Sequence, residues 1–470
     1  MKLRGTLALV VAALALGLYV YFVEIRGEAA KQAADSAART IFAVAPARVT
    51  GLSLDTSDGK LAVLRRDEKR WNLESPIAYP ADADAVDRAL HALEKLESTE
   101  TLEARPADLE PFGLGKDRKT VEVRAMEEAV KTLYLGANTP VGGGRYVELS
   151  NDPNRIFAVS AGALTGLTPT LLELRDKRLL RIAEGGANEL VVRSGGAIVV
   201  RAQRVGAAWS LIEPETAPGD AERIKRVIDD LSLARASGFE DEPQPREKYG
   251  LAKPVLEVDV RGPLFEEQVA FGKADGRTFA ARANDPVILE ANERVIASVP
   301  VTFFDYREKR VLTVDAEAVR GLEFTFPREN LSQKLKRDGQ VWTSETPGLE
   351  LKPVEVEDAL YAIAALEATA LEDTSPDRKQ LGLEPPLATL RAFDEKGALL
   401  GEVSFGDPHP DEGLPALSSQ SPLVWRVSND IGRSVPLSPE AFTNLLVKSA
   451  AAPETAPENA SEPAPEPVSP

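Results

Sequence analysis

The chain has 470 residues, a length that fits about three domains of average size. It carries 74 acidic and 56 basic residues, and the resulting formal net charge of −18 argues against a nucleic-acid partner because a polyanion would be repelled. The sequence has no cysteine, which excludes disulfides, thiolate metal sites and a lipoprotein anchor.

The N-terminal residues include a hydrophobic segment of membrane-spanning length. Thr6 to Val23 contains no charged residue and approaches the roughly 20 residues that a helix needs to cross a bilayer. Lys2 and Arg4 precede it, and positive residues favour the cytoplasmic side. We therefore predict a single-pass anchor over residues 1–27, with a cytoplasmic N-terminus and the bulk of the chain periplasmic or otherwise extracytoplasmic. The alternative is a signal peptide, for which residues 21–24 form a poor cleavage site; whether the segment is cleaved stays open.

Beyond the anchor, three blocks repeat the same order of features at intervals of about 135 residues. Trp71, Trp209 and Trp342 each lie five residues before a proline. Each block continues with an amphipathic helix pattern, a turn of the form X-Gly-Leu, and a strand that ends in Leu-Gly or Phe-Gly. The turns are Phe112-Gly113-Leu114, Tyr249-Gly250-Leu251 and Leu381-Gly382-Leu383, and the strand ends are Leu135-Gly136, Phe271-Gly272 and Phe405-Gly406.

Within each block the apolar periodicity changes from strand to helix and back. In the first block, residues 51–55 and 60–65 read as strands joined by an Asp58-Gly59 turn. The helix that follows Asp82 or Asp84 has a buried stripe at three-and-four spacing, and both later blocks repeat it. The stripes are Val86, Ala89, Leu90, Leu93 and Leu96; Ile224, Val227, Ile228 and Leu231; and Val356, Ala359, Leu360, Ile363 and Leu366.

These patterns predict an α+β fold, in which an N-terminal transmembrane helix is followed by three tandem homologous domains of antiparallel sheet with packed helices. The tryptophans are expected to cover the core side of each sheet. The predicted organisation is an anchor (1–27), a juxtamembrane helical spacer (28–47), repeat domains at 48–181, 182–312 and 313–448, and a disordered Ala/Pro/Glu-rich tail (449–470).

Two short clusters of charged residues end the first and second blocks. Their members are Arg175, Asp176, Lys177 and Arg178, and Arg307, Glu308, Lys309 and Arg310. As an interaction site they would bind an anionic headgroup, a glycan phosphate or an acidic partner. As a domain joint they would pair ions across the linker to the next domain. The third block lacks the cluster and is followed by no further domain, which favours the joint.

The sequence contains few candidates for chemistry. Its two histidines, His91 and His409, have no repeated counterparts, and the acidic loop around His409 is better explained as solvated than as a metal site. The triplet 142–144 lacks the strand, Lys-Ser or Lys-Thr, and helix start of a phosphate loop, so we expect a hairpin there. No nucleophile–base motif occurs. We therefore predict no enzyme activity and no catalytic, cofactor-binding or metal-ligating residues.

The chain resembles bacterial proteins assigned to a domain of unknown function, which combine an N-terminal membrane anchor with tandem copies of one unit. The matching features are Thr6–Val23, Trp71–Pro76, Ala81-Asp82, Phe112-Gly113-Leu114, Leu135-Gly136 and Leu174–Lys177. The resemblance implies an extracytoplasmic partner of an ABC-type transport system, including systems similar to gliding-motility or exopolysaccharide export complexes. It implies no catalytic or binding residues.

Our leading hypothesis is a membrane-anchored extracytoplasmic scaffold or interaction protein, an accessory component of an ABC-type transport or cell-envelope system. Its partners would be the membrane, through the N-terminal helix, and a protein such as an ABC transporter subunit, with no nucleic acid and no cofactor; the oligomeric state is left open. The alternatives are a glycan- or peptide-binding module of the cell envelope and, less favoured, a cryptic carboxylate-dependent hydrolase.

Overall fold

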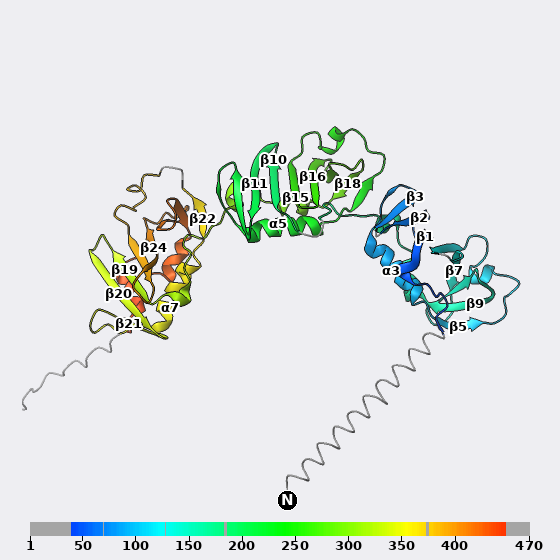
Figure 1. Cartoon of the computed structure of the whole chain (residues 1–470), viewed down its shortest axis with the longest axis horizontal. Helices are drawn as coiled ribbons and strands as arrows, with labels where there is room; N and C mark the ends of the chain where they lie inside the picture. The colour runs from blue at the N-terminus through cyan, green and yellow to red at the C-terminus, as the bar shows by residue number, and fades with distance from the viewer. Residues whose placement is uncertain (1–38, 69, 127, 183–185, 373–375, 448–470) are drawn as a thin grey trace, which may run out of the picture. The chain divides into compact units, whose positions relative to one another are not determined.

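The computed structural model describes residues 39–68, 70–126, 128–182, 186–372 and 376–447. These residues form mostly antiparallel sheet, in three large sheets with few helices (Figure 1). The predicted α+β class is therefore wrong. Each block has one long helix against eight or nine strands, and the shortest strands, of two to five residues, are too short to show the alternation from which strands are predicted.

Several predicted segments lie outside the described residues. They are the hydrophobic segment at residues 6–23, the spacer up to residue 38, and the tail from residue 449 onward. Among the residues that the structure describes, no helix is both long enough and apolar enough to cross a membrane.

The first sheet has nine strands in the order β4-β3-β2-β1-β6-β7-β8-β9-β5. Consecutive strands pair antiparallel through short turns, except where a helix or a longer connection carries the chain to an edge. The strands are β1 (Val49–Asp55), β2 (Leu61–Asp67), β3 (Arg70–Ser75), β4 (Tyr79–Pro80), β5 (Ser98–Leu102), β6 (Lys119–Ala125), β7 (Lys131–Asn138), β8 (Gly144–Leu149) and β9 (Asp152–Ser160).

The second sheet repeats this topology, with nine strands in the order β13-β12-β11-β10-β15-β16-β17-β18-β14. Its strands are β10 (Glu189–Ser194), β11 (Ala197–Val205), β12 (Ala208–Glu213), β13 (Ala217–Gly219), β14 (Gly238–Glu240), β15 (Leu256–Gly262), β16 (Phe265–Ala274), β17 (Arg277–Arg282) and β18 (Ile288–Ala291).

The third sheet has the same order without a counterpart of β4: β21-β20-β19-β23-β24-β25-β26-β22. Its strands are β19 (Gly321–Phe326), β20 (Leu331–Asp338), β21 (Val341–Ser344), β22 (Ala368–Leu371), β23 (Ala388–Phe393), β24 (Leu399–Phe405), β25 (Leu414–Ser418) and β26 (Val424–Val427). One topology thus occurs three times along the described chain.

One long helix follows the third or fourth strand of each copy. These helices are α3 (Ala83–Glu94), α5 (Ala221–Leu233) and α7 (Pro353–Ala364). Shorter helices are α4 (Leu171–Leu174), α6 (Glu293–Ala297) and α8 (Pro439–Phe442), and the 3-10 turns are η2 (Pro46–Arg48), η3 (Glu110–Phe112), η4 (Ala161–Leu167), η5 (Arg246–Tyr249), η6 (Phe303–Tyr306), η7 (Ala316–Ala318), η8 (Asn429–Arg433) and η9 (Thr443–Leu445).

The chain divides into two compact units, and the division runs through the second sheet. One unit contains the first sheet together with β14 and β16–β18, and the other contains β10–β13 together with the third sheet. The predicted domain boundaries after residues 181 and 312 follow the sequence repeat and stay predictions.

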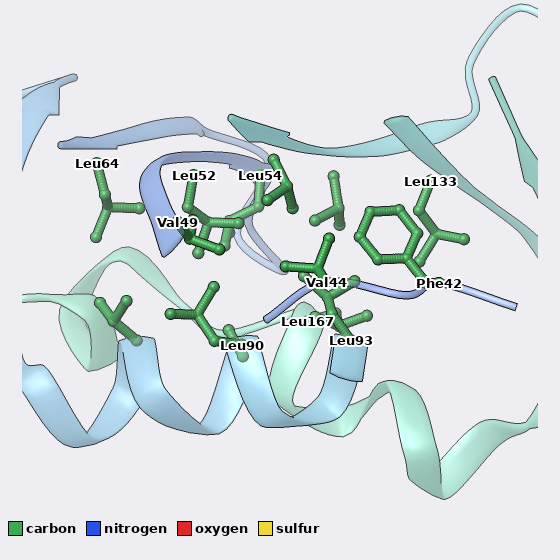
Figure 2. Close-up of a cluster of buried hydrophobic side chains, with 14 of the residues drawn as sticks. Phe42, Val44, Val49, Leu52, Leu54, Leu64, Leu90, Leu93, Leu133 and Leu167 are labelled. Carbon is green, nitrogen blue, oxygen red and sulfur yellow. The ribbon is translucent and has the colours of Figure 1, made fainter. Parts of the chain in front are cut away.

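The core of the first copy lies between its sheet and α3. Asp82 caps the helix by accepting a hydrogen bond from the Ala85 amide at 2.9 Å. Leu90 and Leu93 face the sheet, below side chains of β1 and β2 (Figure 2). Burying each of these leucines contributes about 1.5–3 kcal/mol relative to leaving it in water. Residues of the predicted spacer also enter this core, where Phe42 and Val44 pack beside the helix (Figure 2).

The repeated tryptophans are core residues. Trp71 lies on β3, Trp209 on β12 and Trp342 on β21, and all three are buried. The Trp342 indole N–H donates to Glu357 Oε1 on α7 at 2.7 Å, so the polar end of this ring has a partner. Pro76 and Pro214 directly follow the strands that carry Trp71 and Trp209, whereas β21 already ends at Ser344, before Pro347.

The X-Gly-Leu turn packs against the strand end that repeats with it. The turn glycine is left-handed in all three copies, with φ of 63° at Gly113, 69° at Gly250 and 67° at Gly382. A Cβ at Gly136, the glycine of the Leu135-Gly136 strand end, would overlap the carbonyl oxygen of Phe112. The same overlap would arise between Gly272 and Tyr249 and between Gly406 and Leu381. The two motifs recur together because they are the two sides of one close backbone contact.

Candidate functional site

In each copy an incoming segment of chain meets the end of the long helix. One isolated bridge marks this meeting, and its two residues are separated by the same number of positions in all three copies. The bridges are Thr40 with Glu97, Arg178 with Arg235, and Arg310 with Glu367. The two predicted charged clusters therefore lie at the structural junctions that precede the second and third sheets.

Arg175 is the most enclosed residue of the first cluster. It follows α4 directly and is 2% exposed. Its guanidinium carbon lies 3.8 Å from the ring centre of Phe239 and 4.6 Å from that of Tyr79. Its Nη1 donates to Asp241 Oδ1 at 2.5 Å. The cation thus combines two aromatic faces with one carboxylate, and its contacts join β4 of the first sheet to the β14 region, within one compact unit.

Asp176 anchors the neighbouring arginines. Its buried carboxylate accepts hydrogen bonds from Arg178 Nε at 2.8 Å, Arg178 Nη2 at 2.9 Å and Arg181 Nε at 2.9 Å. Burial raises the pKa of Asp176, but the hydrogen bonds and charge of Arg178, with the charge of Arg181, outweigh burial and hold the pKa below its ordinary value.

Replacing Asp176 by asparagine is expected to lower the stability of the protein in a pH-dependent way. Because the folded pKa lies below the unfolded value of about 3.9, the charged carboxylate stabilises the fold above that pH, and the stabilisation disappears as pH falls through the folded pKa. The loss at neutral pH should be about 1–3 kcal/mol. Thermal unfolding from pH 7 to pH 3 should show wild type and Asp176→Asn converging below about pH 4. The matched control is Glu308→Gln, the exposed acid of the second cluster, which should change little; a gap that stays constant down to pH 3 would contradict the prediction.

We call the contacts around Arg175–Arg178 the first joint and those around Arg307–Arg310 the second joint. A second buried network extends the first joint through Tyr79. Arg282 donates through Nη1 to the Arg178 carbonyl oxygen at 2.5 Å and through Nη2 to the Tyr79 hydroxyl. Asp285 Oδ2 accepts from Arg282 Nε at 3.1 Å and from the Tyr79 hydroxyl at 3.2 Å. Burial raises the pKa of Tyr79 to about 12, so the hydroxyl remains a neutral donor across the physiological range.

The second joint uses Arg307 in a related way. Arg307 is 6% exposed, and its guanidinium carbon lies 5.5 Å from the ring centre of Trp425. Its Nη1 donates to Glu215 Oε1 at 2.7 Å, but the Glu215 side chain is 52% exposed. This carboxylate therefore interacts in a wetter environment than the ion pairs of the first joint.

The other predicted cluster residues contact the linkers mainly through their backbones. The Lys177 carbonyl oxygen accepts from the Ala236 amide at 2.8 Å, and the Lys309 carbonyl accepts from the Ala368 amide at 2.8 Å. The Glu308 amide donates to the Pro218 carbonyl oxygen at 2.9 Å. Arg310 is exposed. The structure therefore buries the side chains of Arg175, Asp176 and Arg307 and leaves the others at least partly in solvent.

Residues 71–240 match the family described as a domain of unknown function (DUF4340), and residues 209–377 match it a second time. The chain belongs to this family. The prediction of a tandemly repeated domain of unknown function is confirmed, and the membrane anchor and the association with ABC-type transport stay predictions. No curated protein and no solved structure matches the chain.

Sequence reasoning missed the residues that contact Arg175 and Arg307. They are Tyr79, Phe239 and Asp241 for Arg175, and Glu215 and Trp425 for Arg307. It also missed Arg282 and Asp285, which bind Tyr79. Trp425 offered one signal, because it is the tryptophan that falls outside the repeated pattern. The others come from edge strands and turns whose positions depend on the folded sheet.

Proposed function

We propose that this protein is a scaffold or interaction protein without enzyme activity that works outside the cytoplasm, attached to the membrane by its hydrophobic residues 6–23. It would serve an ABC-type transport or cell-envelope system as an accessory component. The transport association rests on the family resemblance, and the membrane attachment rests on the sequence.

The observation that carries the scaffold proposal is the contact of Arg175 with Tyr79, Phe239 and Asp241. Arg175 belongs to the linker and is buried between aromatic rings of two successive copies, so its contacts restrict the movement of the linker. A scaffold needs such restricted linkers because it holds its partners at defined positions. The bridge at Arg310 places the second linker against the third copy at the corresponding position. Three similar sheets in one chain also provide several solvent-facing surfaces for partners.

Co-purification from native membranes tests this proposal. The full chain, carrying an affinity tag, is extracted in mild detergent, and its stoichiometric companions are identified by mass spectrometry. We expect a permease or ATPase subunit of one transport system, retained at high salt. A chain that elutes alone and monomeric at every salt and detergent condition would contradict the scaffold proposal.

The location is tested separately in intact cells. A protease added outside the cytoplasmic membrane should digest the three repeats in spheroplasts, and a cytoplasmic marker enzyme should survive in the same sample. Protection of the repeats until the membrane is dissolved would refute an extracytoplasmic location, whatever partner the chain has.

A further inference from the structure

The first sheet carries a hollow of about 440 Å³ beside β5 and the loop between β7 and β8. Its volume falls within the roughly 300–1,000 Å³ range of small-molecule sites. Four hydroxyl side chains line it: Thr99, Thr139, Tyr146 and Ser160. The Glu100 carboxylate adds an acceptor, and Val141, which is 86% exposed, adds an apolar surface.

The loop that forms one wall of the hollow has a defined shape. The Thr139 hydroxyl donates to the Val141 carbonyl oxygen at 2.8 Å and accepts from the Gly144 amide at 3.0 Å. Gly142 and Gly143 have φ of 87° and 64°, a conformation that other residues adopt only with strain. The predicted hairpin is therefore closed by side-chain hydrogen bonds and by two left-handed glycines.

The loop differs between the copies. In the second sheet, Asp275 and Gly276 alone connect β16 to β17, a two-residue turn that is too short to build a comparable wall. The second copy therefore cannot form the same wall, and in the third copy residues 406–413 make a longer connection between β24 and β25. The repeated core does not require the hollow.

The lining chemistry selects a class of ligand. The Tyr146 and Ser160 hydroxyls can both donate and accept hydrogen bonds, whereas Thr99 already donates to the Ala158 carbonyl oxygen at 3.0 Å and Thr139 to that of Val141. A carboxylate accepts from pairs of neighbouring hydroxyl groups. The residues that line the hollow include no lysine or arginine, so they offer no cation to hold a phosphate or sulfate. Tyr146 is fixed by an edge-on contact with Phe112, with ring centres 4.9 Å apart, and Val141 can meet the apolar face of a sugar ring.

We propose that this hollow binds a sugar unit of a neutral saccharide. The wall supplies the Tyr146 and Ser160 hydroxyls as donors and acceptors, the Glu100 carboxylate as an acceptor and a small apolar surface at Val141. Together they match a ring that carries hydroxyls at its rim and C–H groups on its faces. This proposal is independent of the scaffold function, since it concerns a site in one copy and the scaffold concerns the joints.

Saturation-transfer NMR with the full chain in detergent tests the saccharide site. The probes are maltotriose, cellotriose and N-acetylated chitotriose, with glucose 6-phosphate as the anionic comparison. We expect at least one neutral trisaccharide to bind with a Kd in the millimolar range or below, and the phosphate sugar to bind more weakly. Glu100→Gln and Ser160→Ala should each weaken binding by about fivefold to tenfold, since the first replaces a charged carboxylate acceptor by a neutral amide and the second removes a hydroxyl.

Both of these side chains are exposed, so the variants should fold as wild type does. The matched control is Glu242→Gln, the same change at an exposed position of the second copy. The proposal is overturned if no neutral saccharide gives a transfer signal at millimolar concentration. It is equally overturned if Glu100→Gln binds as wild type does, or if glucose 6-phosphate binds more tightly than the trisaccharides.

Discussion

The Gly136→Ala variant is expected to lose about 3 kcal/mol of local stability in the first copy. A Cβ at this position overlaps the Phe112 carbonyl oxygen, and backbone cannot move aside as the tip of a flexible side chain can. Leu114 is fully buried just beyond that turn, so displacing the turn also disturbs a core contact. The stability cost therefore combines overpacking with partial exposure of a leucine.

Hydrogen exchange measured by mass spectrometry can localise this effect, because it reports opening segment by segment. Peptides from β7 and η3 should lose protection in Gly136→Ala, and peptides from the third sheet should not. Gly51→Ala is the matched control, since a Cβ there would lie 3.5 Å from Arg124 Cβ, an ordinary contact, on extended backbone. Equal protection in Gly136→Ala and wild type would show that the close contact between turn and strand does not contribute to the local stability of the first copy.

The Arg175→Ala variant is expected to destabilise the first joint by about 3 kcal/mol. The change removes a buried cation from between Tyr79 and Phe239, leaves a cavity, and takes away the partner of Asp241. Asp241 is about a third exposed, so water can solvate its freed carboxylate and moderate that part of the loss. The larger share comes from the lost stacking and from the cavity.

Protection from exchange should fall together in β14 and in a peptide that spans β4, where Tyr79 and Ala81 carry the reporting amides because Pro80 has none, since Arg175 contacts residues of both strands. Arg310→Ala, which removes an exposed arginine from the corresponding linker of the second cluster, is the control and should leave both segments unchanged. Arg175→Met adds a further comparison, because it restores volume and stacking without charge and should recover part of the loss. Loss of protection in β4 alone would mean that the arginine does not couple the two edge strands.

The helices were predictable because their signal is local. Every member of the three predicted stripes, from Val86 to Leu366, is buried, and Asp82 caps α3 as expected. A period of 3.6 residues over three turns can be read without knowing what the helix packs against. The Asp58-Gly59 hairpin was predictable for the same reason, since turn chemistry is a property of adjacent residues.

The fold class was predicted wrongly because sheet content depends on distant pairing. β5 and β14 are edge strands of five and three residues, and each pairs with a strand about 50 to 60 residues further along the chain. Neither strand shows the alternation that identifies a half-buried strand in sequence. Short edge strands of this kind enlarge the sheets without leaving a signal in the sequence.

The threefold repetition, the three long helices and the recurrence of the two glycine motifs could be predicted from the sequence, because periodicity and turn preference act between near neighbours. Only the folded chain shows that Arg175 lies between Tyr79 and Phe239, that Arg307 contacts Trp425, and that a larger residue than Gly136 would overlap the Phe112 carbonyl oxygen. These contacts join residues far apart in the chain, and their partners are selected by the register of strands, which a single sequence does not encode in any local pattern.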